Sequence, residues 1–360
     1  RYVPSALSAF PAPIAVGHTP WKGVKFYKYS TVGTLLDLQQ SQKALAAQGQ
    51  GQPLTIVDHC VVDRLVHDGH GTVTALETSR GPLAVSSAKV VLAMGTIPPA
   101  TLLMNSFKES LPNIGKRYTG HFMSHITARV KRSAFKDLSA LEIGATYLDG
   151  KAPNGLQYHV QTSAFASANP EADESTIAHE APDAAAVASM AQLKGSEDYV
   201  VFVCATLGEA SEKNPDNWIR MNGGTDPATN ITLQLQPGVE DHHLWDVLDE
   251  APYQSIDVMA GCAGCSAPEV EYWVDDASGN GGRWQQERPD RKKIRLNIIV
   301  HEASPLWMGR DPATSVVGLD YRPHGVHNVY VTGGALFPTS GSWNPTLTMC
   351  GLAQDLADRL

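Results

Sequence analysis

The C-terminal end of the chain carries its clearest hydrophobic periodicity. After Asn344-Pro345, polar residues alternate at helical spacing with the apolar positions Leu347, Met349, Leu352, Ala353, Leu356 and Leu360. Pro345 needs no backbone donor and suits the first helical position, and Asn344 suits the N-cap before it. The pattern therefore predicts a final amphipathic helix with one buried face.

The start of this helix allows two interpretations. Asn344 is either a helix cap alone, or part of a site at the free N–H groups of the helix, where an anion or an electron-rich ring binds. The segment by itself leaves both open.

The N-terminal third alternates between helical and extended patterns. Residues 34–48 have a helical pattern that a glycine-rich turn ends. Three apolar segments separated by turns are typical of strands: residues 54–66, 72–79 and 83–94. The last one runs into Gly95 and a predicted short helix over residues 98–106. A strand, a glycine and a helix start form a weak phosphate-site signal, because many α/β crossovers share it.

Length and charge narrow the class of protein. A chain of 360 residues exceeds what one core usually organises, so two domains are expected. Its composition, 42% hydrophobic and 18% charged, is that of a soluble globular protein, and a net charge of -9 argues against nucleic acid or an anionic membrane as partner. The apolar runs are too short to span a bilayer. From Tyr118 to about Arg295, strands mix with long polar loops, which indicates a second domain with loops for a substrate.

The cysteines and histidines do not predict a metal centre. The five cysteines are too few and too scattered for a disulfide framework. Cys262-Ala-Gly-Cys265 is open to interpretation as a local disulfide, a redox pair or half of a zinc site, but a second close pair is missing. His121 and His125 lack the glutamate of the zinc-protease helix, so a structural role is favoured for both. We therefore predict no metal.

The last sixty residues contain a series of short motifs. In chain order these are His301, Met308-Gly309 with Asp311-Pro312, Val316-Val317, His324-Gly325-Val326 with Asn328-Val329-Tyr330-Val331, Phe337-Pro338-Thr339 and Asn344-Pro345-Thr346. The series resembles the C-terminal segment of the glucose–methanol–choline (GMC) oxidoreductases, FAD enzymes that oxidise alcohols. Asn344 follows His301 by 43 residues, which suits the family's catalytic pair. The Asn-Pro-Thr motif is most similar to the pyranose-oxidase, cholesterol-oxidase and cellobiose-dehydrogenase side of the superfamily.

The resemblance implies an α/β fold of two domains. Residues 1–117 and 301–360 would form a Rossmann-like FAD-binding domain, and residues 118–300 a substrate-binding domain with a mostly antiparallel sheet and helices. Residues 90–106 are similar to the family's strand, glycine and helix near the FAD ribose and pyrophosphate. The implied cofactor-binding set is Val62, near the adenine, with Ala93, Gly95, Gly333, Gly334, Asn344, Pro345 and Thr346.

The resemblance also implies an activity. His301 would be the base that takes the hydroxyl proton of an alcohol or sugar, and Asn344 would hold the substrate oxygen while hydride passes to flavin N5. The electron acceptor would be oxygen or another molecule. Two alternatives remain open: a hydroxynitrile-lyase-like acid/base enzyme that keeps FAD, and a non-catalytic flavin-binding protein.

Several features depart from the family pattern. Gly333 stands where many members carry an acid, and residues 304–307 replace the usual Gly-Thr-containing run. The G-x-G-x-x-G motif of the N-terminal ADP-binding unit is not found. We therefore expect a preceding segment or a separate polypeptide to complete the FAD site, and this chain alone not to bind FAD tightly. Asn230-Ile-Thr232 matches the glycosylation pattern and is a weak indication of a secreted glycoprotein, favouring an extracellular location over a cytoplasmic one.

Overall fold

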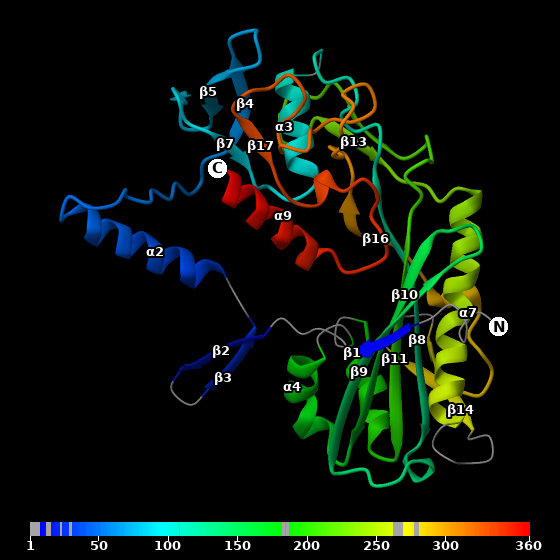
Figure 1. Cartoon of the computed structure of the whole chain (residues 1–360). Helices are drawn as coiled ribbons and strands as arrows, with labels where there is room; N and C mark the ends of the chain where they lie inside the picture. The colour runs from blue at the N-terminus through cyan, green and yellow to red at the C-terminus, as the bar shows by residue number, and fades with distance from the viewer. Residues whose placement is uncertain are drawn as a thin grey trace. The chain divides into compact units, whose positions relative to one another are not determined.

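A computed structural model describes residues 8–11, 16–21, 24–28, 31–107, 109–181, 184, 187–261, 269–276 and 281–360 (Figure 1). The chain divides into two compact units, Ala12–Val61 and the combination of Arg1–Pro11 with Val62–Leu360. Helices and mostly antiparallel sheets together confirm the predicted mixed α/β class.

The smaller unit contains a hairpin and a helix. Strands β2 (Val16–Trp21) and β3 (Val24–Lys28) pair antiparallel, and α2 (Thr31–Ala46) confirms the helix predicted over residues 34–48. The prediction of a strand over residues 54–66 is wrong in its first part, because no strand is assigned to residues 54–61 and β4 begins at Val62. An apolar run becomes a strand only where a neighbouring strand satisfies its backbone groups.

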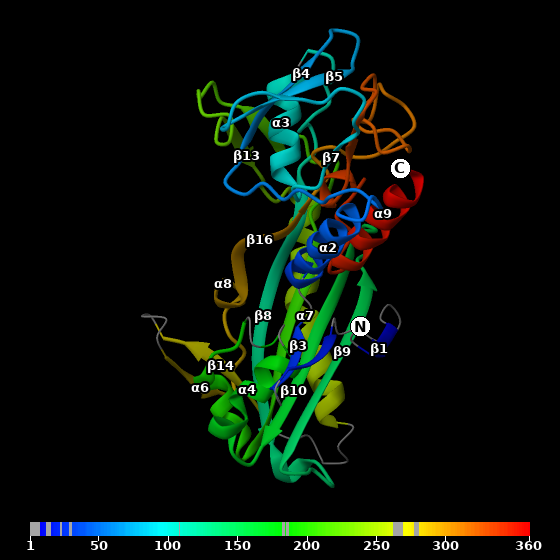
Figure 2. The same cartoon turned by 90° about the vertical axis from the view of Figure 1, so that its left-hand side faces the viewer.

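A long antiparallel sheet dominates the larger unit. Its strand order is β1-β9-β10-β11-β8-β14-β15, and β16 also pairs with β8. The strands are β1 (Ser8–Pro11), β8 (Thr119–Lys131), β9 (Leu141–Lys151), β10 (Gln157–Ser167), β11 (Tyr199–Glu209), β14 (Val270–Asp275), β15 (Gly282–Gln285) and β16 (Arg295–Ala303). Figure 2 shows β8 to β11 running nearly parallel to α7.

The two faces of this sheet have different covers. On one face, α7 (Val239–Gly261) packs Leu244 and Leu248 against Phe122 and Tyr158. On the other, α4 (Pro170–Glu180) covers only one end, where Ile177 packs in a small core with Phe165 and Val203. Side chains alternate between the two faces along a strand. The rest of this second face therefore carries His121 and every second residue of β8 after it.

A second core lies around a short parallel pair, β7 (Val90–Leu92) with β17 (Val329–Val331). The helix predicted over residues 98–106 is confirmed as α3 (Ile97–Phe107), and the segment predicted as one strand over residues 83–94 contains two short strands, β6 (Leu83–Ala84) and β7. The remaining elements are β4 (Val62–His67), β5 (Val73–Thr78), β12 (Trp218–Met221), β13 (Ile231–Gln234), α6 (Met190–Leu193), α8 (Arg291–Ile294), α9 (Thr346–Arg359) and the 3-10 turns η1 (Arg132–Ala134), η2 (Lys194–Ser196) and η3 (Gly334–Leu336).

The final helix is confirmed, but its predicted buried face is wrong in extent. Only Leu356 is fully buried, Met349 and Leu352 are half-buried, and Leu347 is 80% exposed. Helix α9 therefore contacts the core mainly through its C-terminal half, and periodicity alone could not show how much of the face finds a partner.

Candidate functional site

Two glycines meet at the carboxyl ends of β7 and β17. Gly95 has φ 78° and Gly333 has φ 99°, which are backbone conformations that residues other than glycine rarely adopt. A Cβ atom built on Gly333 would lie 3.2 Å from the Gly95 carbonyl oxygen, whereas one on Gly95 would meet nothing within 4 Å. Ligands of α/β proteins bind at such strand ends. The predicted residues Ala93, Gly95, Gly333 and Gly334 all follow these two strands, and we call this set the glycine junction.

The strand that carries His301 ends against the glycine junction. The Thr96 hydroxyl donates to the Glu302 carbonyl oxygen at 2.9 Å. A Cβ atom on Gly334 would lie 2.8 Å from Thr96 Oγ1 and 3.1 Å from Glu302 O. The same position is 3.6 Å from Met349 Sδ, so the first turn of α9, with Pro345 and Thr346 at its start, also lies beside the junction.

Val62 lies apart from these glycines in the topology. It is the first residue of β4, it pairs with Thr78 of β5, and its half-buried side chain packs on the core around β7 and β17. The structure therefore places it on a different sheet from the other predicted cofactor residues.

His301 has an unusual backbone and a histidine partner. Its φ is 59°, a left-handed conformation that typically costs about 1–3 kcal/mol, and the pairing of β16 with β8 shifts register on both sides of Val300. His301 Nδ1 lies 3.0 Å from His121 Nδ1. The two rings meet edge to face, with centroids 5.0 Å apart. The strain is consistent with a side chain held for a purpose other than packing.

Burial keeps two neighbouring histidines neutral. His121 and His159 have no exposed surface. Burial, followed by the charge of His301, lowers the pKa of His121 to about 4, against the opposing effect of the Ser340 and Gly341 backbone. Burial, followed by the charge of His121, lowers the pKa of His159 to about 3. The His159 ring also stacks on Trp343, with centroids 4.9 Å apart.

The Asn344 side chain forms hydrogen bonds across the sheet instead of capping α9. Gln161 Nε2 donates to Asn344 Oδ1 at 3.0 Å, and Asn344 Nδ2 donates to the Tyr147 hydroxyl at 3.2 Å. The helix cap is Pro345, whose carbonyl accepts from the Met349 N–H, and it makes no side-chain bond. The predicted cap at Asn344 is therefore wrong by one residue, and the predicted first helical position of Pro345 is the cap itself. The Asn344 amide bonds to Gln161 and Tyr147 instead of to the first turn of α9.

Strand register brings these groups together. Tyr147 stands directly opposite Gln161 in the β9–β10 pair, and His159 lies two residues earlier on the same face. Gln161 Nε2 is also 3.0 Å from His159 Nε2. We call His121, Tyr147, His159, Gln161, His301 and Asn344 the polar cluster. Both predicted catalytic residues, His301 and Asn344, belong to it.

Sequence reasoning missed three members of the polar cluster. The sequence analysis assigns no role to Tyr147, His159 and Gln161, although His159 and Gln161 are polar residues two apart, on either side of Val160. That spacing was the available signal, because it places both on one face. His125, by contrast, bonds to the Thr127 hydroxyl at 3.1 Å through Nε2, and burial lowers its pKa to about 4.

A pocket of about 450 Å³ opens beside the start of α9. Residues 336–345 form most of its wall, together with Met308, Leu319, Thr348 and Leu352. Asn344 and Pro345 are thus exposed to a mainly apolar space that borders the polar cluster.

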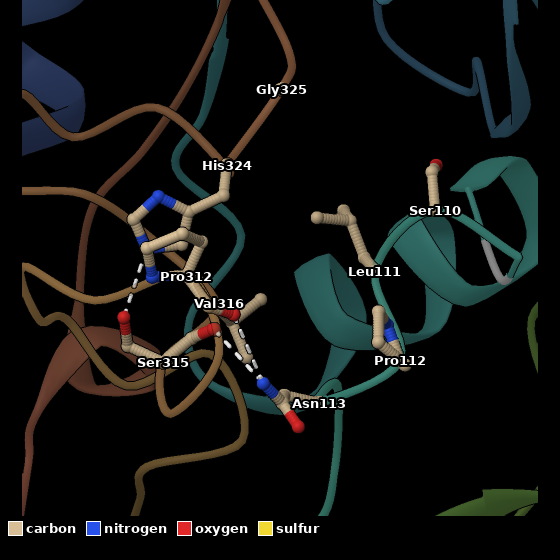
Figure 3. A pocket seen from close by; sticks show the side chains of 9 residues that line it. All are labelled: Ser110, Leu111, Pro112, Asn113, Pro312, Ser315, Val316, His324 and Gly325. Atoms are coloured by element: carbon tan, nitrogen blue, oxygen red, sulfur yellow. Dashed lines mark hydrogen bonds between the residues drawn. The ribbon is translucent and has the colours of Figure 1, made fainter.

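A second pocket, of about 230 Å³, holds a serine and a histidine (Figure 3). Ser315 Oγ lies 2.8 Å from His324 Nε2, and it donates to the Asp311 carbonyl oxygen at 2.7 Å. Asn113 Nδ2 reaches the carbonyls of Pro312, Ala313 and Ser315. These side chains fold their own loop, and the hydroxyl proton of Ser315 is used on a carbonyl, so the pair is not arranged as a nucleophile and its base.

Other predicted features have separate outcomes. Cys262 and Cys265 lie outside the described residues, and within the described ranges no group of three or more His, Cys, Asp or Glu side chains could hold a metal ion. No helix in the described part of the chain is long and apolar enough to cross a membrane. Asn230 is 7% exposed and its amide nitrogen donates to Asn105 at 2.8 Å, which disfavours a glycan on the folded chain.

Comparison with known proteins agrees with the motif series. Residues 213–353 match the family model described as GMC oxidoreductase. No curated protein sequence matches the chain. Among solved structures, it is similar to pyridoxine 4-oxidase from Mesorbium loti, with 15% identity, a TM-score of 0.48, and coverage of 85% of this chain and 58% of that one. An FAD-dependent oxidoreductase from Chaetomium thermophilum has 11% identity, a TM-score of 0.46, and coverage of 88% and 62%.

Both structural likenesses are loose, and the chain spans less than two thirds of the length of either protein. The family match is independent of them and includes both His301 and Asn344. Over residues 213–353, the chain therefore carries the C-terminal domain of the GMC oxidoreductases.

Proposed function

We propose that this chain forms the substrate-facing part of an FAD-dependent oxidoreductase that oxidises a CH–OH group of an alcohol or sugar. The observation that carries the proposal is the polar cluster, in which His301 contacts His121, Asn344 bonds to Gln161, and the charges of His121 and His301 act on the neighbouring His159. The strand of His301 ends beside the glycine junction. GMC oxidoreductases use FAD, and the family match extends over both residues.

The glycine junction fits a dinucleotide. Gly95 has open space where a Cβ would stand, so a phosphate or ribose could approach the backbone there. We assign Ala93, Gly95, Gly333 and Gly334 to that part of FAD. Pro345, Thr346 and Asn344 at the start of α9 would face the isoalloxazine ring, and Val62 the adenine. When bound, FAD supplies the hydride acceptor at N5.

His301 and Asn344 would act on one hydroxyl group. A histidine nitrogen accepts the hydroxyl proton, which is the base catalysis that alcohol oxidation needs. The Asn344 amide nitrogen has two N–H groups, of which one donates to Tyr147, so the second can hold the substrate oxygen. The neighbouring buried histidines exclude water from this end of the site.

The proposed division into domains follows the two cores. The core around β7 and β17 draws on residues 65–118 and 306–356, and the core under α7 draws on residues 122–294. This supports the boundaries of the proposed cofactor domain (residues 1–117 and 301–360) and substrate domain (residues 118–300), except that Tyr118 and Ile219 pack in the first core and residues 12–61 form a compact unit of their own.

We also propose that a polypeptide outside this chain completes the FAD site. Apolar side chains on β7 and α9 are left uncovered, since Val91 is 42% exposed and Leu347 is 80% exposed. The substrate would be a small alcohol or carbohydrate, and the electron acceptor oxygen or another molecule.

Anaerobic mixing of a panel of alcohols with the chain, loaded with flavin in the presence of the polypeptide that completes the FAD site, tests the function. Loss of the oxidised flavin absorption is expected with at least one alcohol, and His301→Ala should keep flavin but slow its reduction about 10²–10⁴-fold. His243→Ala, an exposed position on α7, is the matched control and should reduce at the parental rate. Release of cyanide from a cyanohydrin without flavin reduction would instead identify a lyase. Bound flavin that responds to neither would identify a binding protein.

A further inference from the structure

A turn closed by the Thr339 hydroxyl lies shortly before Asn344. Thr339 Oγ1 accepts from the Gly341 N–H at 3.1 Å, and Gly341 has φ 58°. A threonine hydroxyl has one proton, and Thr339 donates its proton to Glu209 Oε2 at 3.3 Å. This hydroxyl therefore closes the turn and also joins it to the large sheet. We call residues 339–341 the Thr339 turn.

Glu209 joins the Thr339 turn to a second strand. It is the last residue of β11 and is only 5% exposed. Its Oε1 accepts from the N–H of Gln157, the first residue of β10, at 2.7 Å. A buried carboxyl group is costly unless its oxygens are hydrogen-bonded, and here each oxygen has a partner. The carboxyl group of Glu209 therefore links the start of β10 to the turn.

The same two segments meet again in the polar cluster. Gln161 of β10 donates to Asn344 Oδ1, and the His159 ring of β10 stacks on Trp343. Gln157, His159 and Gln161 lie two residues apart along β10, so they share one face of the sheet. Both contacts therefore depend on the distance between β10 and the loop that follows the Thr339 turn.

Two other bonds hold this region against β8. Arg117 Nη1 donates to the Pro338 carbonyl oxygen at 3.2 Å, and the Ser340 hydroxyl donates to the Gly120 carbonyl oxygen at 3.2 Å. Gly120 is the second residue of β8, and Arg117 lies just before that strand. Glu209 differs from these partners because its bonds continue from the turn into β10.

We propose that Glu209 is a positioning residue that fixes, through the Thr339 hydroxyl, the distance between β10 and the loop that carries Trp343 and Asn344. The placement stands on the hydrogen bonds of Glu209, and its use in catalysis rests on the proposed function. There, the Asn344 amide has to hold a substrate oxygen in one geometry. A displacement of about 1 Å at such a site can slow a reaction about 10²-fold.

Fluorine NMR on the cofactor-free chain tests the placement without any flavin. The seven tryptophans are replaced by 5-fluorotryptophan, and Trp343→Phe assigns the Trp343 signal. Glu209→Leu removes the acceptor of both bonds, so the Trp343 ring should leave its position on His159 and its signal should shift, while the circular dichroism stays parental. If Glu209→Leu does not fold, Glu209→Asp replaces it, because a side chain one methylene shorter cannot reach both donors. A parental Trp343 signal in the folded Glu209 variant would overturn the proposal.

Substitutions of Thr339 test the same link from the other side. Thr339→Val keeps the shape but not the hydroxyl and should shift the Trp343 signal, whereas Thr339→Ser keeps the hydroxyl and should give the parental signal. The matched control is Thr74→Val in β5, which removes a threonine bond of the same 3.3 Å length to the Val66 carbonyl and should leave the Trp343 signal unchanged. An unshifted signal in Thr339→Val, or an equal shift in Thr339→Ser, would also overturn the proposal.

Flavin reduction by an alcohol then separates this proposal from the proposed function. If the Trp343 signal shifts as expected but no alcohol reduces the flavin of the loaded parent chain, the proposed function fails and the placement stands. If the parent is reduced, Thr339→Val should slow the reduction by up to about 10²-fold, and Thr339→Ser should recover toward the parental rate. A parental rate in Thr339→Val with a shifted Trp343 signal would overturn the catalytic use of the placement.

Discussion

The bond between Gln161 and Asn344 gives a quantitative test of how the site is held. A cap at Asn344 would act only on α9, whereas the structure joins Asn344 to β10 and β9 through two hydrogen bonds. We therefore predict that substitutions at residues 161 and 344 are energetically coupled.

The expected magnitudes follow from the number of bonds. Each hydrogen bond contributes about 0.5–1.5 kcal/mol net, so Asn344→Ala should lower the free energy of unfolding by about 1–3 kcal/mol. Loss of a cap alone would cost about 1 kcal/mol, so the single variant does not separate the two explanations. The coupling energy between the two positions separates them, because Gln161→Leu already removes the Gln161–Asn344 bond before Asn344 is changed.

The assay is urea unfolding of the parent, the two single variants and the double variant. The double variant should be more stable than the sum of the single effects predicts, by about 0.5–1.5 kcal/mol. A second cycle pairs Asn344→Ala with Ser106→Ala on α3. Ser106 bonds to Leu65 N–H at 2.9 Å and contacts neither partner, so this cycle should be additive. Additivity within about 0.5 kcal/mol in the first cycle as well would refute the reasoning and return Asn344 to a cap.

Two further predictions concern close packing and pH. Gly334→Ala places a Cβ atom 2.8 Å from Thr96 Oγ1, so it should lower the free energy of unfolding in urea by about 1–3 kcal/mol. The control Gly351→Ala in α9 has nothing within 4 Å of its Cβ atom and should raise that free energy by up to about 1 kcal/mol. Equal effects of the two substitutions would contradict the close approach at the glycine junction. In the folded chain the pKa is about 4 for His121 and about 3 for His159, below the pKa near 6.5 of a histidine in the unfolded chain. Between the folded and unfolded pKa values, the unfolded chain therefore binds more protons than the folded chain. The free energy of unfolding should then fall as the pH decreases from 6.5. Each histidine contributes up to about 1.4 kcal/mol per pH unit, and His159→Phe should flatten the dependence while the exposed His243→Gln does not; an unchanged slope in His159→Phe would show that His159 is not buried in its neutral form.

Some features of this protein depend on residues that are close in sequence, and these were predictable. The helix over residues 98–106 and the final amphipathic helix follow from periodicity and from prolines at helix starts. The motif series from His301 to Thr346 likewise identified the GMC region that the family match confirms over residues 213–353. Helix propensity and short motifs act within a few residues, so the chain expresses them without reference to its fold.

The tertiary structure alone decided how those residues are used. His121 and His301 are 180 residues apart, and Asn344 meets Gln161 and Tyr147 across 183 and 197 residues. Asn344 had a local signal for a cap, but an amide bonds to the partners that the fold brings within 3 Å or so, and strand register supplied Gln161 and Tyr147. Burial had the same origin, because the sequence shows which face of α9 is apolar but not which neighbours reach it. The sequence motifs therefore predicted His301 as the candidate base. Its neutral partner His121 and the orientation of the Asn344 amide depend on the long-range packing of the antiparallel sheet.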